Sequence, residues 1–137
     1  MDDRVSANVQ AGARVLVAED NRDAADSLAK LLVLFGYEVR VARDGPQTIA
    51  AAVDWRPGFI LLDIGMPAMH GYEVATRLRQ EASCRETVII AVTGYGQEDD
   101  RRRSRAVGID HHLLKPVPSQ VLPSLLSRSE AMSAAGG

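Results

Sequence analysis

The 137-residue chain has the length of one domain, with a formal net charge of −2 and 46% hydrophobic residues. This near-neutral balance gives no general attraction to nucleic acid or to an anionic membrane, and no apolar run approaches the ~20 residues that a membrane span requires. The single cysteine, Cys84, excludes an internal disulfide framework and favours a reducing, cytoplasmic location.

The two ends of the chain have the composition of tails, and the region between them has the pattern of a folded domain. We expect flexible tails over residues 1–12 and 129–137, because both lack hydrophobic periodicity and are rich in small or polar residues. Residues 13–128 are then expected to form one domain, in which short apolar runs alternate with helical patterns.

The predicted domain begins with a strand and an amphipathic helix. The apolar run at 15–18 is typical of a strand covered on both faces. Asn21 is placed to cap the helix that follows, and Gly36 is placed to end it. The predicted buried face of this helix consists of four apolar residues at helical spacing: Ala25, Leu28, Leu32 and Phe35.

A second strand is predicted at 37–42, where apolar and charged residues alternate as in an edge strand. Asp44 is predicted to cap a short helix that ends before Pro57 and Gly58. The predicted inward face of that helix consists of Ile49, Ala50 and Val53.

The second half of the domain repeats this alternation. The further strands are predicted at 59–63, 87–92 and 111–114, and the further helices at 71–80, at 97–107 and from about Ser119. Val74 and Leu78 are expected on the core side of their helix, and the arginine-rich run at 101–105 is interpreted as a solvated helix face. Alternating strands and helices with short connections predict a parallel sheet with helices on both faces. In this class, ligands bind at the carboxyl ends of the strands.

Polar side chains stand at the carboxyl ends of four of the predicted strands. They are Glu19 and Asp20 after the first strand, Asp63 at the end of the third, Thr93 after the fourth and Lys115 after the fifth. Any one of them could be a helix cap or a surface residue, but their shared position indicates one site.

The chemistry of these residue types favours phosphoryl transfer. Carboxylates gathered at one point repel each other unless a cation is present, and Mg²⁺ prefers oxygen ligands. One carboxylate could then attack phosphorus to give an acyl phosphate, while the metal and Lys115 neutralise the charge of the transferring group. The hydroxyl of Thr93 could donate a hydrogen bond to a phosphate oxygen.

Four segments of the chain resemble a known family: VLVAEDN (15–21), FILLDIGMPAMHGYEV (59–74), IIAVTGYG (89–96) and GIDHHLLKPV (108–117). In their order and spacing they resemble the receiver domain of two-component response regulators, most closely the receivers of hybrid sensor histidine kinases. The resemblance implies a flavodoxin-like α/β fold, a (βα)5 three-layer sandwich with a parallel sheet of order 2-1-3-4-5.

The resemblance also implies roles for the site residues. Asp63 would take a phosphoryl group from a phosphohistidine of a histidine kinase or phosphotransfer domain, with Mg²⁺ as cofactor. Asp20, Asp63 and the backbone carbonyl of Gly65 would hold the metal directly, and Glu19 would act through water. Lys115 would contact the phosphoryl group.

A conformational switch is implied at Thr93 and at the aromatic position of the fifth strand, which is His112 in this chain. Movement of Thr93 toward the phosphate would change the surface around the helix at 97–107 and the strand at 111–114. The same surface would allow a homodimer, whereas direct contacts with nucleic acid or a membrane are not expected.

Further details follow from the resemblance. The Lys115–Pro116 bond would be cis, and Tyr95 would partly shield the phosphoryl group from water. His70 and His111 are interpreted as loop and strand-end residues.

Two alternatives to this phosphorylation-driven switch stay open. A degenerate receiver could bind partners without phosphate, which the presence of His112 would favour. An Asp-nucleophile phosphatase would need a second Asp where Gly65 stands, so a signalling receiver that catalyses only its own phosphorylation and dephosphorylation is favoured over an enzyme.

Overall fold

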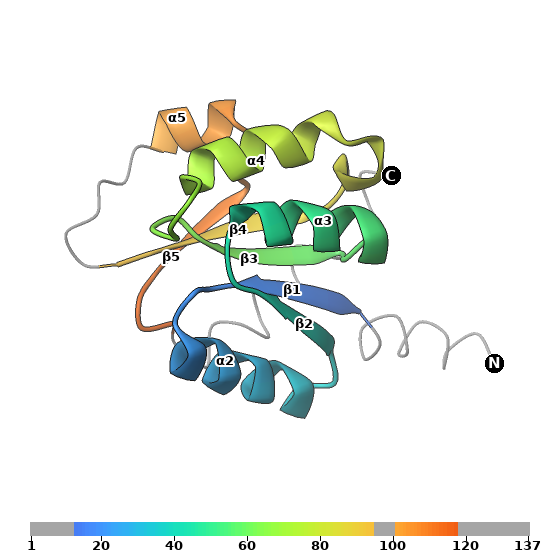
Figure 1. Ribbon diagram of the computed structural model, residues 1–137, viewed down its shortest axis with the longest axis vertical. Coiled ribbons are helices and arrows are strands. Elements are labelled where there is room, and N and C mark those ends of the chain that lie inside the picture. Colours follow the sequence, from blue (N-terminus) through green and yellow to red (C-terminus); the bar gives the residue numbers. More distant parts are fainter. Residues whose placement is uncertain (1–12, 95–100, 118–137) are drawn as a thin grey trace.

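The computed structural model describes residues 13–94 and 101–117, which form five strands and the helices between them (Figure 1). In chain order the elements are β1 (Arg14–Ala18), α2 (Arg22–Leu34), β2 (Glu38–Ala42), α3 (Gly45–Trp55), β3 (Phe59–Asp63), α4 (Gly71–Gln80), η1 (Ala82–Cys84), β4 (Val88–Thr93), α5 (Arg101–Ala106) and β5 (His111–Leu114). The expectations that lie outside the described residues concern both tails, Tyr95, the start of the helix at 97–107 and the last helix from Ser119.

The five strands form one parallel sheet in the order β2-β1-β3-β4-β5, which confirms the predicted topology and places β2 at an edge. Helix α2 covers one face of the sheet, and α3, α4 and α5 lie on the other (Figure 1). Because β1 and β3 are neighbours, Ala18 pairs with Leu62 at the carboxyl edge of the sheet. The residues that follow Ala18 are therefore brought close to Asp63.

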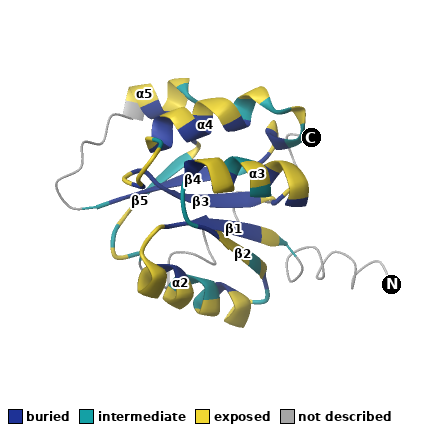
Figure 2. Cartoon of the chain, viewed as in Figure 1, coloured by how far each residue is buried: buried dark blue, intermediate teal, exposed yellow. Residues whose placement is uncertain are grey.

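The domain has an apolar core on each face of the sheet. Alternate strand residues such as Leu16, Ile60 and Ile89 pack with α3 and α4. The residues between them, such as Leu61 and Ile90, pack with α2. The central strands are therefore buried on both faces, as Figure 2 shows, and this explains their continuous apolar sequences.

Both predicted ends of α2 are confirmed. The Oδ1 of Asn21 accepts a hydrogen bond from the N–H of Ala24 at 2.9 Å, which satisfies a donor of the first turn. Gly36 follows the helix with a φ of +97°, and the N–H of Tyr37 donates to the carbonyl of Leu32 at 3.1 Å. This arrangement is a Schellman motif, which favours glycine at the left-handed position.

Three residues that were predicted to face the core are exposed instead. Phe35 is 39% exposed, because α2 ends one residue before it. In α3, Ala50 and Val53 are both exposed. The buried face of α3 consists of Gly45, Thr48, Ala52 and Trp55. Thr48 can be buried because its hydroxyl donates to the carbonyl of Asp44 at 2.7 Å, so this polar residue does not mark the outer face.

Helices α4 and α5 differ in which of their described side chains are buried. Val74 and Leu78 of α4 are buried, as predicted. The arginine side chains that the structure describes in α5 are exposed, in agreement with a solvated face. Gly108 follows α5 with a φ of +94°. Within the described ranges, no helix is long and apolar enough to cross a membrane.

Candidate functional site

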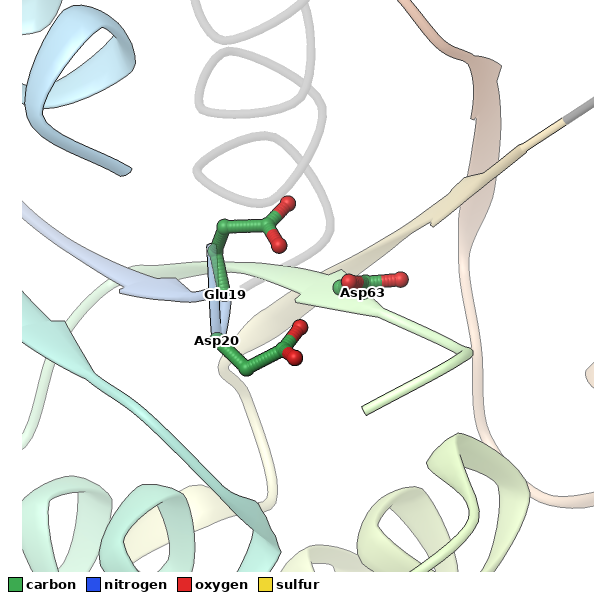
Figure 3. Close-up of side chains that lie close together, drawn as sticks. All are labelled: Glu19, Asp20 and Asp63. Carbon is green, nitrogen blue, oxygen red and sulfur yellow. The ribbon is translucent and has the colours of Figure 1, made fainter. Parts of the chain in front are cut away.

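Three carboxylates meet at the carboxyl edge of the sheet. Glu19 and Asp20 follow β1, and Asp63 is the last residue of the neighbouring strand β3. One oxygen of each carboxylate lies within 4.8 Å of the others, and Figure 3 shows Glu19 and Asp20 reaching toward Asp63. Glu19 and Asp63 are buried, whereas Asp20 is exposed. Such a concentration of negative charge requires a cation nearby.

Lys115 contributes a positive charge to this cluster. Its Nζ lies 3.0 Å from Oδ2 of Asp63 and 3.0 Å from Oε1 of Glu19. The N–H of Lys115 donates to the carbonyl of Thr93 at 2.8 Å, which holds the residue beside the end of β4. The Lys115–Pro116 bond is cis, as the resemblance implied. One ammonium therefore contacts both buried carboxylates.

Backbone N–H groups contact the remaining oxygens of the two buried carboxylates. The N–H of Asn21 donates to Oε2 of Glu19 at 3.1 Å, and the N–H of Gly65 donates to Oδ1 of Asp63 at 3.0 Å. In each buried carboxylate, one oxygen thus accepts a hydrogen bond from a backbone N–H and the other contacts the ammonium of Lys115. These contacts fix the orientation of both side chains.

The environment shifts the protonation of Glu19 and Lys115. Burial raises the pKa of Glu19, and the nearby charge of Asp63 adds to this rise against hydrogen bonds from Asn21 and Lys115. Burial by itself would lower the pKa of Lys115, but its contacts with Asp63 and Glu19 outweigh burial and raise that pKa. The site therefore keeps Lys115 charged and makes Glu19 a weaker acid than a free glutamate.

The loop after Asp63 is tightly constrained. The N–H of Gly71 donates to the carbonyl of Ile64 at 3.1 Å, and a Cβ on Gly71 would lie 2.7 Å from the Cα of Ile64. Only glycine fits there without a backbone shift. Ala68 has a φ of +76°, a left-handed conformation that residues with a Cβ seldom adopt. This loop carries Gly65, which is exposed beside the carboxylates.

The two residues expected to form a switch lie on neighbouring strands. Thr93 ends β4 and is 7% exposed. His112 on β5 is paired in register with Ala91, so its side chain and that of Thr93 are on the same face of the sheet. The Nε2 of His112 lies 2.8 Å from the Oγ of Ser104 in α5.

Other residues of this region were not predicted from the sequence. The Nδ1 of His70 accepts a hydrogen bond from the N–H of Tyr72 at 3.1 Å and caps α4, a role suggested only by its position before that helix. The burial of Ser104 and its bond to Tyr72 have no signal in the sequence, because a serine among arginines is typical of an exposed helix.

A cavity of about 440 Å³ opens beside the carboxylates. Glu19, Asp63 and Lys115 line it together with Leu28 and Leu31 of α2. Three residues of the site therefore form part of the lining of this cavity.

Comparison with known sequences identifies relatives over most of the chain. The sequence model of one protein family, the response regulator receiver domain, matches residues 15–127. The transcriptional regulatory protein PrrA of Mycobacterium tuberculosis H37Rv is 37% identical over 119 residues, which cover 87% of this chain and 49% of PrrA. The polar-differentiation response regulator DivK of Brucella anthropi is 32% identical over 103 residues, which cover 75% of this chain and 84% of DivK. The chain thus spans about half the length of PrrA.

Solved structures with the same fold include two receivers. The chemotaxis response regulator CheY4 of Vibrio cholerae has a TM-score of 0.79 and 30% identity, covering 86% of this chain and 98% of its own. The receiver domain of a sensor histidine kinase from Pseudomonas aeruginosa PAO1, solved with a magnesium ion coordinated in its active site cleft, has a TM-score of 0.78 and 30% identity, covering 85% and 96%.

Proposed function

We propose that this chain, which belongs to the response regulator receiver domain family, accepts a phosphoryl group on Asp63 from a phosphohistidine of a histidine kinase or phosphotransfer domain. The contact of one lysine, Lys115, with two buried members of a three-carboxylate cluster carries the proposal. This arrangement combines a nucleophile with the cationic groups that phosphoryl transfer requires.

The donor set of the site suits Mg²⁺. Carboxylate oxygens within 4.8 Å of one another are the hard ligands that this ion prefers. Asp20 and Asp63 would bind the metal directly, Gly65 would offer its backbone carbonyl, and Glu19 would act through water. When bound, the ion supplies charge neutralisation for the transferring group.

Three residues of the site would then have separate roles in the transfer. A carboxylate oxygen of Asp63 attacks phosphorus, and the P–O bond forms as the P–N bond to the donor imidazole breaks. Lys115 contacts the phosphoryl oxygens as a compact positive charge. Thr93 donates its hydroxyl to another phosphoryl oxygen. Glycine occupies position 65, where an Asp-nucleophile phosphatase would carry its second Asp, which favours a switch over an enzyme.

The output of this switch would be a changed surface around α5 and β5. Movement of Thr93 at the end of β4 would be passed to α5, the next described element along the chain. A downstream protein or a second copy of the chain would bind that surface. The net charge of −2 favours a protein partner over nucleic acid or a membrane, and the free Cys84 suits the cytoplasm.

Incubation with Mg²⁺ and acetyl phosphate tests the proposal. The intact mass should rise by one phosphoryl group, with acetate as the leaving group. The Asp63→Asn variant should show no gain, whereas Asp54→Asn, at an exposed position of α3, should behave as the wild type. No gain in mass with any small phosphodonor or kinase would exclude Asp63 as an acceptor.

A degenerate receiver is the second candidate, because His112 occupies the position that usually holds Tyr or Phe and is hydrogen-bonded to Ser104. Such a module would bind its partners without phosphate. NMR shifts that stay unchanged when Mg²⁺ and beryllofluoride are added would favour this second function.

A further inference from the structure

Ser104 is a buried contact point of helix α5. Of the α5 side chains that the structure describes, only Ser104 is buried, with 0% exposure. A surface helix ordinarily buries an apolar stripe, whereas the described buried position of α5 is a serine. The contacts of Ser104 therefore help to set the position of α5, together with Val107 and Ile109, which follow the helix and pack in the core.

Ser104 connects α5 to both α4 and β5. Its Oγ lies 3.1 Å from the hydroxyl of Tyr72 and 2.8 Å from Nε2 of His112. The guanidinium of the adjacent Arg103 lies 4.7 Å from the centre of the Tyr72 ring. Tyr72, a residue of α4, is itself buried in the core, so it gives α5 a fixed docking point.

The hydrogen bonds of Ser104 do not depend on one tautomer of His112. The serine hydroxyl has one proton, so when it donates to Tyr72 it accepts from Nε2–H of His112. When Tyr72 donates instead, Ser104 donates to an unprotonated Nε2. The network therefore stays closed in both neutral forms, and what it requires is that α5 and β5 keep their relative position.

We infer that Tyr72, Ser104 and His112 form a latch that holds α5 in the observed position, and that phosphorylation favours a state in which Ser104 has left His112. This inference rests on the proposed function. Thr93 ends β4 and α5 is the next described element along the chain, so a displacement of Thr93 would act on that helix. The backbone of His112 is paired with Ala91, two positions before Thr93 inside β4, so it stays with the sheet. In this chain His112 acts as a fixed anchor for α5.

Thermodynamic linkage gives the latch a measurable consequence. An interaction that stabilises only the unphosphorylated arrangement opposes the binding of a phosphoryl analogue, so its removal must tighten that binding. Damage to the structure would instead weaken binding or leave it unchanged. The direction of the change therefore separates a latch from a merely structural contact.

The Ser104→Ala variant tests this consequence. We expect hydrogen exchange of the amides at 105–109 to become about three- to tenfold faster, the size expected for the loss of one hydrogen bond. In the same variant, beryllofluoride with saturating Mg²⁺ should bind about threefold more tightly. The Ser83→Ala variant, in η1, is a matched control in which neither quantity should change.

Two further variants keep the test independent of how well Ser104→Ala folds. Tyr72→Phe removes the hydroxyl that contacts Ser104 but keeps the ring below Arg103. His112→Phe removes the Nε2 that contacts Ser104 but keeps an aromatic ring. Both should tighten beryllofluoride binding, and Tyr72→Phe should add little to Ser104→Ala because the two changes remove a shared bond.

The possible results separate the two proposals. If beryllofluoride binds the wild type but no more tightly to Ser104→Ala and His112→Phe, the latch is overturned and the proposed function stands. If the wild type itself binds no beryllofluoride, the proposed function is overturned. Independently of that result, unchanged hydrogen exchange at 105–109 in Ser104→Ala would show that Ser104 does not hold α5.

Discussion

The Nζ of Lys115 lies 3.0 Å from the Oδ2 of Asp63, although the two residues are 52 positions apart in the chain. Lys115 and a metal ion would therefore compete for the same carboxylate oxygens. If Mg²⁺ takes over the balance of negative charge, the ammonium becomes free to contact an incoming phosphoryl group.

Replacement of Lys115 by methionine should separate metal binding from phosphorylation. Phosphorylation of Asp63 by acetyl phosphate should slow by about 10²-fold or more, because a positive charge on the transferring group is lost. Mg²⁺ should bind more tightly, because no ammonium competes with it. Intact mass gives the rate and calorimetry gives the affinity. Lys30→Met, at an exposed position of α2, should match the wild type, and weaker Mg²⁺ binding in Lys115→Met would contradict competition.

The stability of the domain should depend on pH through Glu19. Burial raises the pKa of this carboxyl above the ordinary value of 4.5, so the folded state binds its proton more tightly than the unfolded chain does. The contribution of Glu19 to the free energy of unfolding should therefore fall as the pH rises from about 4.5 through the folded-state pKa.

Urea unfolding in the presence of a chelator measures this effect. Glu19→Gln cannot titrate, so it should gain stability relative to the wild type as the pH rises over that interval. Glu86→Gln, at an exposed position, should run parallel to the wild type. A gain by the wild type over Glu19→Gln would reverse the sign and contradict the proposed effect of burial.

Gly71→Ala should destabilise the loop beside Asp63. The added Cβ would lie 2.7 Å from the Cα of Ile64, so the backbone must move, at a cost of about 1–3 kcal/mol in the free energy of unfolding. At Gly58 an added Cβ would meet only a carbonyl oxygen at 3.9 Å. Gly58→Ala is therefore the control, with an expected change below about 1 kcal/mol in urea unfolding. Equal effects of the two changes would show that the close approach at Gly71 has little energetic weight.

Arg79→Met should cost far more stability than the same change two residues earlier on α4. The Nη2 of Arg79 donates to the carbonyl of Gly108 at 2.8 Å and to Oδ2 of Asp110 at 2.9 Å, which ties α4 to the turn before β5. We expect a loss of about 2–3 kcal/mol, because charged hydrogen bonds to a half-buried partner are removed.

The matched control for Arg79 lies on the same helix. Arg77 forms an exposed pair with Glu73 at 3.3 Å, and Arg77→Met should change the free energy of unfolding by no more than about 0.5 kcal/mol. Thermal or urea unfolding of both variants gives the comparison. A loss in Arg79→Met no larger than that in Arg77→Met would argue against a connecting role.

The central strands could be predicted from the sequence because burial on both faces requires a continuous apolar run. The strands at 59–63 and 111–114 have the predicted bounds. The orientation of α3 could not be predicted, because its sequence is apolar on several sides. The orientation of α3 depends on Trp55, which lies against the guanidinium groups of Arg14 in β1 and Arg40 in β2. Contacts between such distant segments cannot be read from the sequence of the helix itself.

The site could be predicted as a set of residues but not as a set of contacts. Parallel strands bring their carboxyl ends together whatever the details of packing, which is why Glu19, Asp63 and Lys115 could be grouped in advance. The bridging of two carboxylates by one ammonium depends on side-chain positions. The burial of Ser104 depends on the approach of Tyr72 from another helix, which helical periodicity does not reveal.

Trp55 is the only tryptophan of the chain, and it lies 5.4 Å from the guanidinium of Arg14, the residue that begins β1. It therefore marks the amino-terminal edge of the sheet, opposite the edge where the carboxylates meet. Its indole fluorescence is an intrinsic optical signal for unfolding that occupancy of the distant cluster should leave unchanged. Tryptophan fluorescence can thus report the unfolding of the unlabelled protein without interference from ligand binding at the carboxylates.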